Sequence, residues 1–194
     1  MGAAQAPAAT LLAIGGVAPR IDPAAFVAAG ARLIGDIELG ADASIWYKCV
    51  VRADVNKIRI GARSNIQDGS VIHCDSPKPG RPEGFPTLVG EEVLIGHLAM
   101  VHGCVLHDRA FVGLGAIVMD GCEIEGEAML AAGAMLTPGK IIRAGELWAG
   151  RPAKLLRRLS PDELAAHRAD VEHYVQLARA HRAAAAGGSV QAAS

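Results

Sequence analysis

Three histidines in the middle of the chain have side chains that could bind a metal ion. His73, His97 and His102 end the segments Val-Ile-His, Ile-Gly-His and Met-Val-His, and none of them occupies a regular apolar position. Imidazole nitrogens bind zinc at about 2.0 to 2.1 Å, and three of them leave one coordination position open for water or substrate. A single histidine is more often a surface or hydrogen-bonding residue, so the metal hypothesis depends on whether the fold brings these three together.

The spacing of the apolar residues indicates which fold positions the three histidines. Bulky apolar side chains recur every six residues, a period that fits neither an α-helix nor a simple strand alternation. A hexapeptide repeat of this kind predicts a parallel β-helix, in which three six-residue sides form one coil of about eighteen residues. The repeat positions form three runs: Ile21, Val27, Leu33, Leu39, Ile45 and Val51; Ile60, Ile66 and Ile72; and Leu88, Leu94, Met100, Leu106, Val112, Val118, Ile124, Leu130, Leu136, Ile142 and Trp148.

Small residues are expected where such a coil turns its corners. They follow the later repeat positions by four residues, at Cys104, Ala110, Ala116, Cys122, Ala128 and Ala134. The four cysteines, Cys49, Cys74, Cys104 and Cys122, form no CxxC pair. We therefore expect them to be reduced residues of the core or the corners.

The repeat stops near Trp148, and a helical pattern replaces it. The segment Ser160-Pro161-Asp162-Glu163 is typical of a helix start, with Ser160 as the cap and Glu163 closing a capping box. We predict an all-β fold, a β-helix, followed by a C-terminal α-helix that ends near Arg182. The predicted parts are an N-terminal segment 1–14, a β-helix domain 15–152, a helical segment 153–182 that packs on the β-helix, and a flexible tail 183–194.

The stretch from Cys74 to Thr87 is rich in proline and glycine, and we expect it to leave the coil as a loop. If about ten of its residues form that loop, His73 and His102 are about nineteen residues apart in the coil and lie on adjacent coils of one face. His97 lies up to about 16 Å from His102 along an extended strand, so it cannot easily join them within one chain. The spacing predicts a metal site between subunits, and a cyclic trimer would repeat that site three times.

Composition is consistent with one soluble domain. The chain has 194 residues, is 51% hydrophobic and carries a formal net charge of -1. This balance gives no reason to expect nucleic-acid binding. The apolar stretch from Thr10 to Val17 is too short to span a bilayer and has no basic flank before it, so we expect a cytoplasmic protein without a signal peptide or a membrane partner.

Three motifs resemble the γ-class carbonic anhydrase family, in particular its shorter bacterial branch of hexapeptide-repeat proteins. They are Val51-Arg52-Ala53-Asp54, then Asn65-Ile66-Gln67-Asp68-Gly69-Ser70-Val71-Ile72-His73, and Ile95-Gly96-His97-Leu98-Ala99-Met100-Val101-His102-Gly103-Cys104. The resemblance extends from about Gly15 to Tyr174. It implies a left-handed coil, a homotrimer, and a metal held by His73 and His102 of one subunit and His97 of another. The metal is expected to be zinc, although imidazole ligands also suit iron or cobalt.

The same resemblance implies roles for further polar residues. Gln67 is expected to hydrogen-bond the metal-bound solvent, and Arg52 and Asp68 to form an ion pair across the subunit boundary, with Asp54 in the same polar cluster. Tyr174 is similar to a family residue near the metal pocket, although packing of the helix explains a tyrosine there equally well.

One departure from the family pattern concerns proton transfer. The archetype carries a glutamate directly after the aspartate of its Arg-x-Asp motif, where this chain has Val55, and a further glutamate on a long acidic loop. The loop after His73 holds only Asp75 and Glu83 as acids, so Glu83 is the candidate for proton transfer.

The reaction that the resemblance implies is reversible hydration of carbon dioxide to bicarbonate, with metal-bound hydroxide as the nucleophile at subunit interfaces. Two other classes of function remain open. One is an acyltransferase or thioesterase acting on a coenzyme A thioester, with a histidine as general base. The other is a trimeric metal-binding scaffold with low activity, which the valine at position 55 keeps open.

Overall fold

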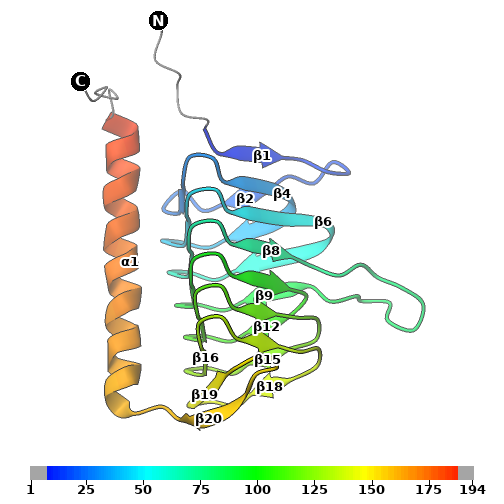
Figure 1. Ribbon diagram of the computed structural model, residues 1–194. Coiled ribbons are helices and arrows are strands. Elements are labelled where there is room, and N and C mark those ends of the chain that lie inside the picture. Colours follow the sequence, from blue (N-terminus) through cyan, green and yellow to red (C-terminus); the bar gives the residue numbers. More distant parts are fainter. Residues whose placement is uncertain (1–7, 188–194) are drawn as a thin grey trace, which may run out of the picture.

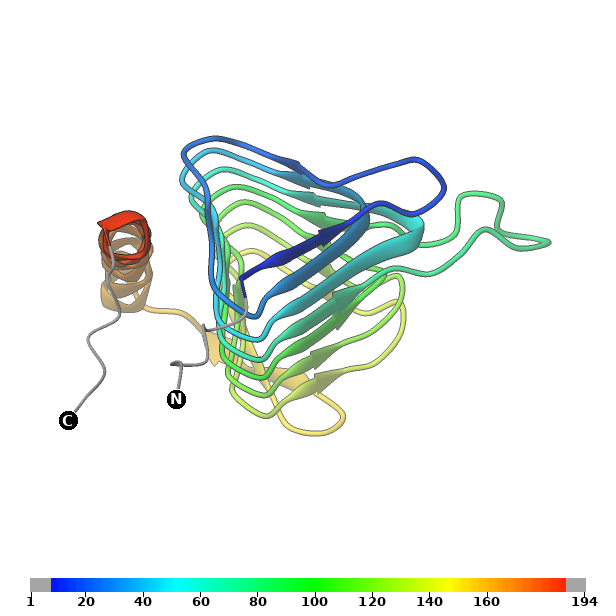
Figure 2. The same ribbon diagram turned by 90° about the horizontal axis from the view of Figure 1, so that it is seen from above.

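The computed structural model describes residues 8–187, and it shows a parallel β-helix with one long α-helix alongside (Figure 1). Seen from above, the coil has a triangular outline (Figure 2). The predicted fold class, a left-handed β-helix of hexapeptide repeats followed by a C-terminal helix, is confirmed. Within the described residues, no helix is both long and apolar enough to cross a membrane.

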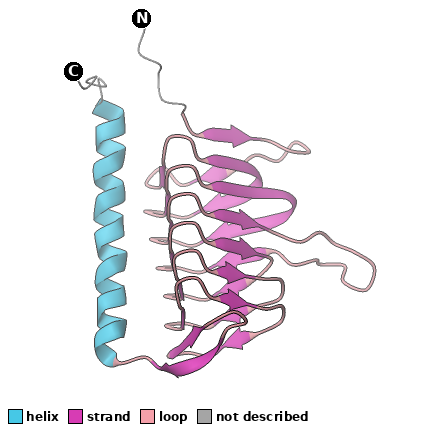
Figure 3. Ribbon diagram, in the orientation of Figure 1, coloured by secondary structure: helices cyan, strands magenta, loops and turns pink. Residues whose placement is uncertain are grey.

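The strands form two sheets, coloured magenta in Figure 3. The larger contains β1 (Thr10–Leu12), β2 (Arg20–Ile21), β4 (Arg32–Leu39), β6 (Val50–Ile60), β8 (Val71–His73), β9 (Thr87–Val89), β11 (Met100–His102), β12 (Val105–Leu106), β14 (Ile117–Val118), β15 (Glu123–Ile124), β17 (Met135–Leu136) and β18 (Ile141–Ile142). The smaller contains β3 (Phe26–Val27), β5 (Ser44–Ile45), β7 (Asn65–Ile66), β10 (Leu94–Ile95), β13 (Phe111–Val112), β16 (Met129–Leu130), β19 (Glu146–Ala149) and β20 (Lys154–Arg158).

One apolar core runs along the axis of the coil. Residues one coil apart are strand partners, as in the pairs Leu106–Ile124 and Ile124–Ile142, and all three of these side chains are at most 1% exposed. The corner residues also face inward, since the predicted small residues from Cys104 to Ala134 are at most 1% exposed. All four cysteines are free and buried, as expected.

The predicted repeat register is wrong in one stretch. Met100 is 40% exposed, Leu88 is only half-buried, and Leu94 is buried outside the core cluster. The core positions there are Val89, Ile95 and Val101, each one residue later. The coil is seventeen residues long at this level, because Met100 pairs with Ile117 and Leu88 with Val105.

The ends of the coil also differ from the predicted boundaries. The strand β1 lies within the predicted N-terminal segment and pairs in parallel with β4, so the sheet begins before residue 15. The predicted helical segment begins with a strand instead, because β20 folds back antiparallel on β19. At the last repeat position, Trp148 is only partly buried.

The helix α1 (Pro161–Gly187) starts as the sequence predicts. The Ser160 amide donates to the Glu163 carboxylate over 2.8 Å, and the Glu163 amide donates to the Ser160 hydroxyl over 3.2 Å. The helix continues past the predicted end at Arg182, because the alanines that follow favour helix strongly. The predicted flexible tail is therefore helical up to Gly187, and its remaining residues lie outside the described part of the chain.

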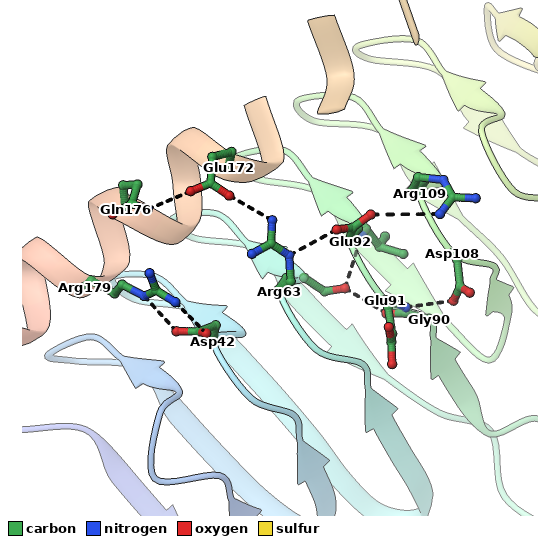
Figure 4. A network of polar contacts seen from close by, with 12 residues as sticks. Asp42, Arg63, Gly90, Glu91, Glu92, Asp108, Arg109, Glu172, Gln176 and Arg179 are labelled. Atoms are coloured by element: carbon green, nitrogen blue, oxygen red, sulfur yellow. Dashed lines mark hydrogen bonds and ion pairs between the residues drawn. The ribbon is translucent and has the colours of Figure 1, made fainter. Parts of the chain in front are cut away.

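A row of charged side chains fixes α1 to one corner of the coil. This charge ladder consists of Asp42, Arg63, Glu92, Arg109 and Glu127, which all have positive φ angles and alternate in sign. From the helix, Arg179 contacts Asp42 at 2.8 Å, Glu172 contacts Arg63 at 3.0 Å and Arg168 contacts Glu127 at 2.9 Å. Figure 4 shows the part of this ladder around Arg63.

Candidate metal centre

His73 and His102 lie side by side on adjacent coils. They end β8 and β11 and are direct strand partners, as the sequence predicts. His73 Nδ1 and His102 Nε2 are 2.9 Å apart, and the two ring centroids are 4.9 Å apart. Two imidazole nitrogens thus face each other on one outer face of the coil.

The other nitrogen of each ring faces a carboxylate. His73 Nε2 lies 3.0 Å from Asp54 Oδ1, and His102 Nδ1 lies 2.5 Å from Asp120 Oδ1. An ionised carboxylate can only accept, so both of these ring nitrogens donate their hydrogen. In two neutral rings this leaves lone pairs on His73 Nδ1 and His102 Nε2, pointing at each other across 2.9 Å.

Two opposed lone pairs at this distance repel each other, and a cation between them would relieve this repulsion. Two ligands of one tetrahedral zinc ion are about 3.3 Å apart when each bond is about 2.05 Å. An opening of the pair by about 0.4 Å would therefore admit such an ion, and carboxylate partners on the outer nitrogens are usual for histidines that bind metals. The donor set fits a divalent metal, for which His73 and His102 provide two of the ligands.

Hydrogen bonds to the backbone hold the two strands together beside the pair. The buried Thr87 hydroxyl donates to the His73 carbonyl and accepts a hydrogen bond from the Gly103 amide over 2.9 Å. Asn56 ties the base of the loop that follows His73, because its amide donates to the carbonyls of Asp75 and Glu83. The loop itself leaves the coil, as predicted (Figure 2).

The electrostatic setting favours a neutral His73 beside an ionised Asp54. Burial is the main cause that lowers the pKa of His73, against the opposing effect of its hydrogen bond to Asp54. For Asp54, burial acts to raise the pKa, but hydrogen bonds from His73 and Arg52 outweigh it and leave the pKa lowered. A neutral imidazole is the form that binds metal.

His97 lies elsewhere, at the corner before β11. Its Nδ1 is 3.0 Å from Asp68 Oδ2, and both residues line a cavity of about 480 Å³ together with Tyr47, Lys48 and Leu98. Within residues 8–187, no cluster of three or more potential ligand side chains is assembled. One chain therefore brings two of the predicted ligands together and keeps the third apart.

Gln67 and Tyr174 lie on the same side of the corner as His97. Gln67 is 5% exposed, and its side-chain amide donates to Asn65 Oδ1 over 3.1 Å. The ring of Tyr174 packs edge-on against Trp46, with centroids 5.8 Å apart. Burial is the main cause that raises the pKa of Tyr174, and the nearby charge of Asp68 adds to it.

The remaining predicted residues lie near Asp54. Arg52 forms an ion pair with Asp54 at 2.6 Å rather than with Asp68 of its own chain. Glu83 is exposed on the loop and lines a cavity of about 440 Å³ together with Asp54 and Val55.

The candidate residues thus form two groups on two sides of one corner. The histidine-pair group consists of Arg52, Asp54, His73, His102 and Asp120 on the outer face of the larger sheet. The helix-side group consists of Gln67, Asp68, His97 and Tyr174.

Asp120 is the one member of these groups that the sequence did not indicate. It follows His102 by eighteen residues, one more than the seventeen-residue coil at this level, so it lies beside the position that stacks on His102. An acidic residue about one coil after a candidate ligand is the signal that could have found it. An aspartate followed by glycine outside the repeat positions otherwise looks like an ordinary turn.

Known proteins resemble this chain over most of its length. No model of a protein family matches it. It is 43% identical to mitochondrial γ carbonic anhydrase 1 of Arabidopsis thaliana over 90% of this chain and 63% of the plant protein. A probable carbonic anhydrase of Methanocaldococcus jannaschii is 38% identical over 78% of this chain and 91% of its own length.

A solved structure shares both the sequence and the fold. The hexapeptide transferase family protein of Anaplasma phagocytophilum is 46% identical, with a TM-score of 0.82 over 88% of this chain and 97% of that one. Together with the repeat, the coil and the motifs around the histidine pair, these similarities place the protein in a family. The chain belongs to the γ-class carbonic anhydrases among the hexapeptide-repeat proteins.

Proposed function

We propose that the protein is a homotrimeric, metal-dependent catalyst of the reversible hydration of carbon dioxide to bicarbonate. The observation that carries this proposal is the separation of the candidate residues into the histidine-pair group and the helix-side group. Each group alone is an incomplete site, since the histidine pair offers two ligands and His97 is isolated from it. A head-to-tail contact between copies would join the two groups, and a cyclic trimer closes such contacts.

Apolar side chains near both groups suit such a contact. Leu98, Met100 and Leu114 are 73%, 40% and 51% exposed. Met100 also lines a cavity of about 210 Å³ with His102 and Asp120. Exposed apolar side chains that surround a polar site are typical of a protein interface.

In the assembled site, the side chains of the two groups have distinct tasks. His73 and His102 of one subunit and His97 of the next would hold the ion, which is zinc in the simplest case and iron or cobalt as alternatives. When bound, the ion supplies a Lewis acid that lowers the pKa of water, a property best known from carbonic anhydrases themselves. Gln67 would orient the reacting water through its amide, and Arg52 would pair with Asp68 of the neighbour once the subunits meet.

Proton removal is assigned to Glu83. Val55 is 43% exposed in the cavity that Glu83 shares with Asp54, and it can accept no proton. Glu83 is therefore the carboxylate of this cavity that lies on the loop and remains free of the histidine pair.

Mixed trimers of two inactive variants test the shared site. His97→Ala and His102→Ala each remove a ligand from every site of a uniform trimer. If the ligands come from two subunits, refolding the variants together in equal amounts restores about one quarter of the sites. An intact site needs a subunit with an intact His97 on one side of the contact and a subunit with an intact His102 on the other, and each occurs in about half of the cases. Zinc content per chain and carbon dioxide hydration, followed by a pH indicator in stopped flow, should both recover to about that fraction. No recovery in verified mixed trimers would contradict the proposal.

Acyl transfer is the second candidate, and the description of the Anaplasma phagocytophilum relative as a hexapeptide transferase supports it. The two functions can be distinguished by whether the reaction depends on the metal. A transferase that uses a histidine as general base should consume acetyl coenzyme A after removal of the metal, whereas carbon dioxide hydration should stop.

A further inference from the structure

We propose that Asp120 is a positioning residue that fixes His102 for metal binding. The inference rests on the proposed function, because it concerns the same metal site. Asp120 Oδ1 lies 2.5 Å from His102 Nδ1, on the side of the ring opposite to His73.

The contact selects one tautomer of His102. A carboxylate accepts the hydrogen of Nδ1, so Nε2 keeps its lone pair and faces Nδ1 of His73. Without Asp120, the hydrogen could sit on either nitrogen and the ring could turn about its χ2 angle. The site would then have to select both the tautomer and the ring orientation at the moment of binding.

Hydrogen bonds fix the backbone on both sides of Asp120, and a glycine leaves space for its carboxylate. The Gly139 amide donates to the Asp120 carbonyl over 3.0 Å, and the Gly121 amide donates to the Gly103 carbonyl over 2.8 Å. A Cβ atom at Gly103 would lie 2.4 Å from Asp120 Oδ1, and the φ angle of Gly103 is +53°. Only glycine at position 103 leaves room for the carboxylate directly after the histidine that it contacts.

A second histidine and carboxylate provide a comparison within the chain. His107 Nε2 and Glu123 Oε2 are 3.6 Å apart, too far for a hydrogen bond, and both side chains are nearly half exposed. Asp120 is by contrast in hydrogen-bond contact, and its side chain is 34% exposed. The hydrogen-bond contact therefore distinguishes His102 from His107.

Zinc affinity of the trimer tests the inference without any activity measurement. Metal-free protein is titrated with zinc in competition with a chromophoric chelator, and its thermal unfolding is recorded in parallel. Loss of an outer carboxylate partner typically weakens metal binding by about 10- to 100-fold. We expect that loss in Asp120→Ala and a smaller one in Asp120→Asn, whose amide oxygen still accepts from Nδ1.

The matched control is Glu123→Gln, which should keep the zinc affinity within about twofold. The unfolding temperature of metal-free Asp120→Ala and Asp120→Asn should stay close to that of the parent, which separates positioning of the ligand from support of the fold. Parent-like zinc affinity in Asp120→Ala would overturn the inference. A weakened zinc affinity in Asp120→Asn that comes only with a loss of stability would overturn it too. Either result would leave the proposed function intact. If the parent itself bound none of zinc, cobalt and ferrous iron, the proposed function would fail and this inference with it.

Discussion

His73 Nδ1 and His102 Nε2 face each other at 2.9 Å across two adjacent coils, while Asp54 and Asp120 contact the outer nitrogens of the same rings. Four side chains on successive coils thus form one line. The order of its members places the two free lone pairs at the centre, where a cation belongs.

Replacing His102 by alanine should remove the metal and leave the coil folded. The side chain is 33% exposed and lies outside the apolar core, so its loss should cost no more than about 1 kcal/mol of unfolding free energy. Elemental analysis should find about one metal ion per chain in the parent and almost none in the variant. Circular dichroism of the variant checks the fold, and global unfolding would contradict this placement of His102.

Leu98 is expected to stabilise the contact between subunits. It is 73% exposed and has a φ angle of +58°, a left-handed backbone conformation that is unfavourable for leucine. The stacked positions of the neighbouring coils, 69 and 115, are glycines in the same conformation. Leu98→Asn should therefore leave the single chain intact and weaken the trimer by about 1.5 to 3 kcal/mol for each buried leucine. Light scattering over a dilution series measures the shift.

The control for this variant is Leu155→Asn, because Leu155 is 54% exposed but lies on β20, away from the histidine pair. Dilution should dissociate Leu98→Asn at higher concentrations than Leu155→Asn. An unchanged trimer in Leu98→Asn would mean that this corner lies outside the subunit contact.

His167 should make the docking of α1 sensitive to acid. Its side chain is 3% exposed and packs edge-on against Phe111, and within the described residues its Nε2 has no hydrogen-bond partner. Burial is the main cause that lowers its pKa, although the charges of Asp170, Glu127 and Glu92 oppose the shift.

A lowered pKa in the folded state means that the unfolded chain takes up the proton first. The stabilisation is therefore complete above the ordinary value of 6.5 and is lost as the pH falls through the lower folded value. His167→Leu should reduce the dependence of the unfolding temperature on pH below 6.5. The exposed neighbour provides the control, since His173→Gln should retain the parent's pH dependence.

The corrected register predicts unequal losses of stability for two apolar residues, Ile95 and Leu88. Ile95 is fully buried in the core, whereas Leu88 points outward and is half-buried. Ile95→Ala should cost about 2 to 5 kcal/mol, as is usual for a large-to-small change in a core. Denaturant unfolding should find a clearly smaller loss for Leu88→Ala, and the reverse order would restore the register of the uninterrupted repeat.

Glu83→Gln should slow the release of protons without affecting the metal. We expect kcat for hydration to fall about 100-fold, the low end of typical general acid–base contributions, with unchanged metal content. High concentrations of a small buffer should restore part of the rate. Glu91→Gln serves as the control, since Glu91 is exposed and does not line the cavity with Asp54. Equal rates in both variants would remove Glu83 from the mechanism.

The sequence predicts most of the coil because burial enforces its period. Leu33, Ile45 and Leu130 must point inward whatever surrounds them, so a count of six finds them. The register error at Leu88, Leu94 and Met100 arose because an apolar residue follows each of them directly, so both registers satisfy hydrophobicity. Only the pairing of strands reveals that one coil is a residue shorter.

For the site, spacing was sufficient where both partners lie on the coil. The stacking of His73 on His102 followed from the length of one turn and the length of the loop. Asp120 was not predicted, because a contact between outward side chains on adjacent coils leaves no mark in the apolar period. The sequence also predicts that His97 is separated from His73 and His102 within one chain. That the three histidines meet at a subunit interface stays a prediction.

The alternating signs of the charge ladder have a consequence for the height at which α1 docks. A displacement of the helix by one coil, about 4.8 Å, would move Glu172 from Arg63 towards Asp42 or Glu92, and every such step would oppose like charges. The helix therefore has one favourable level along the coil axis. Because Tyr174 belongs to this helix, the same ladder decides which coil the tyrosine faces.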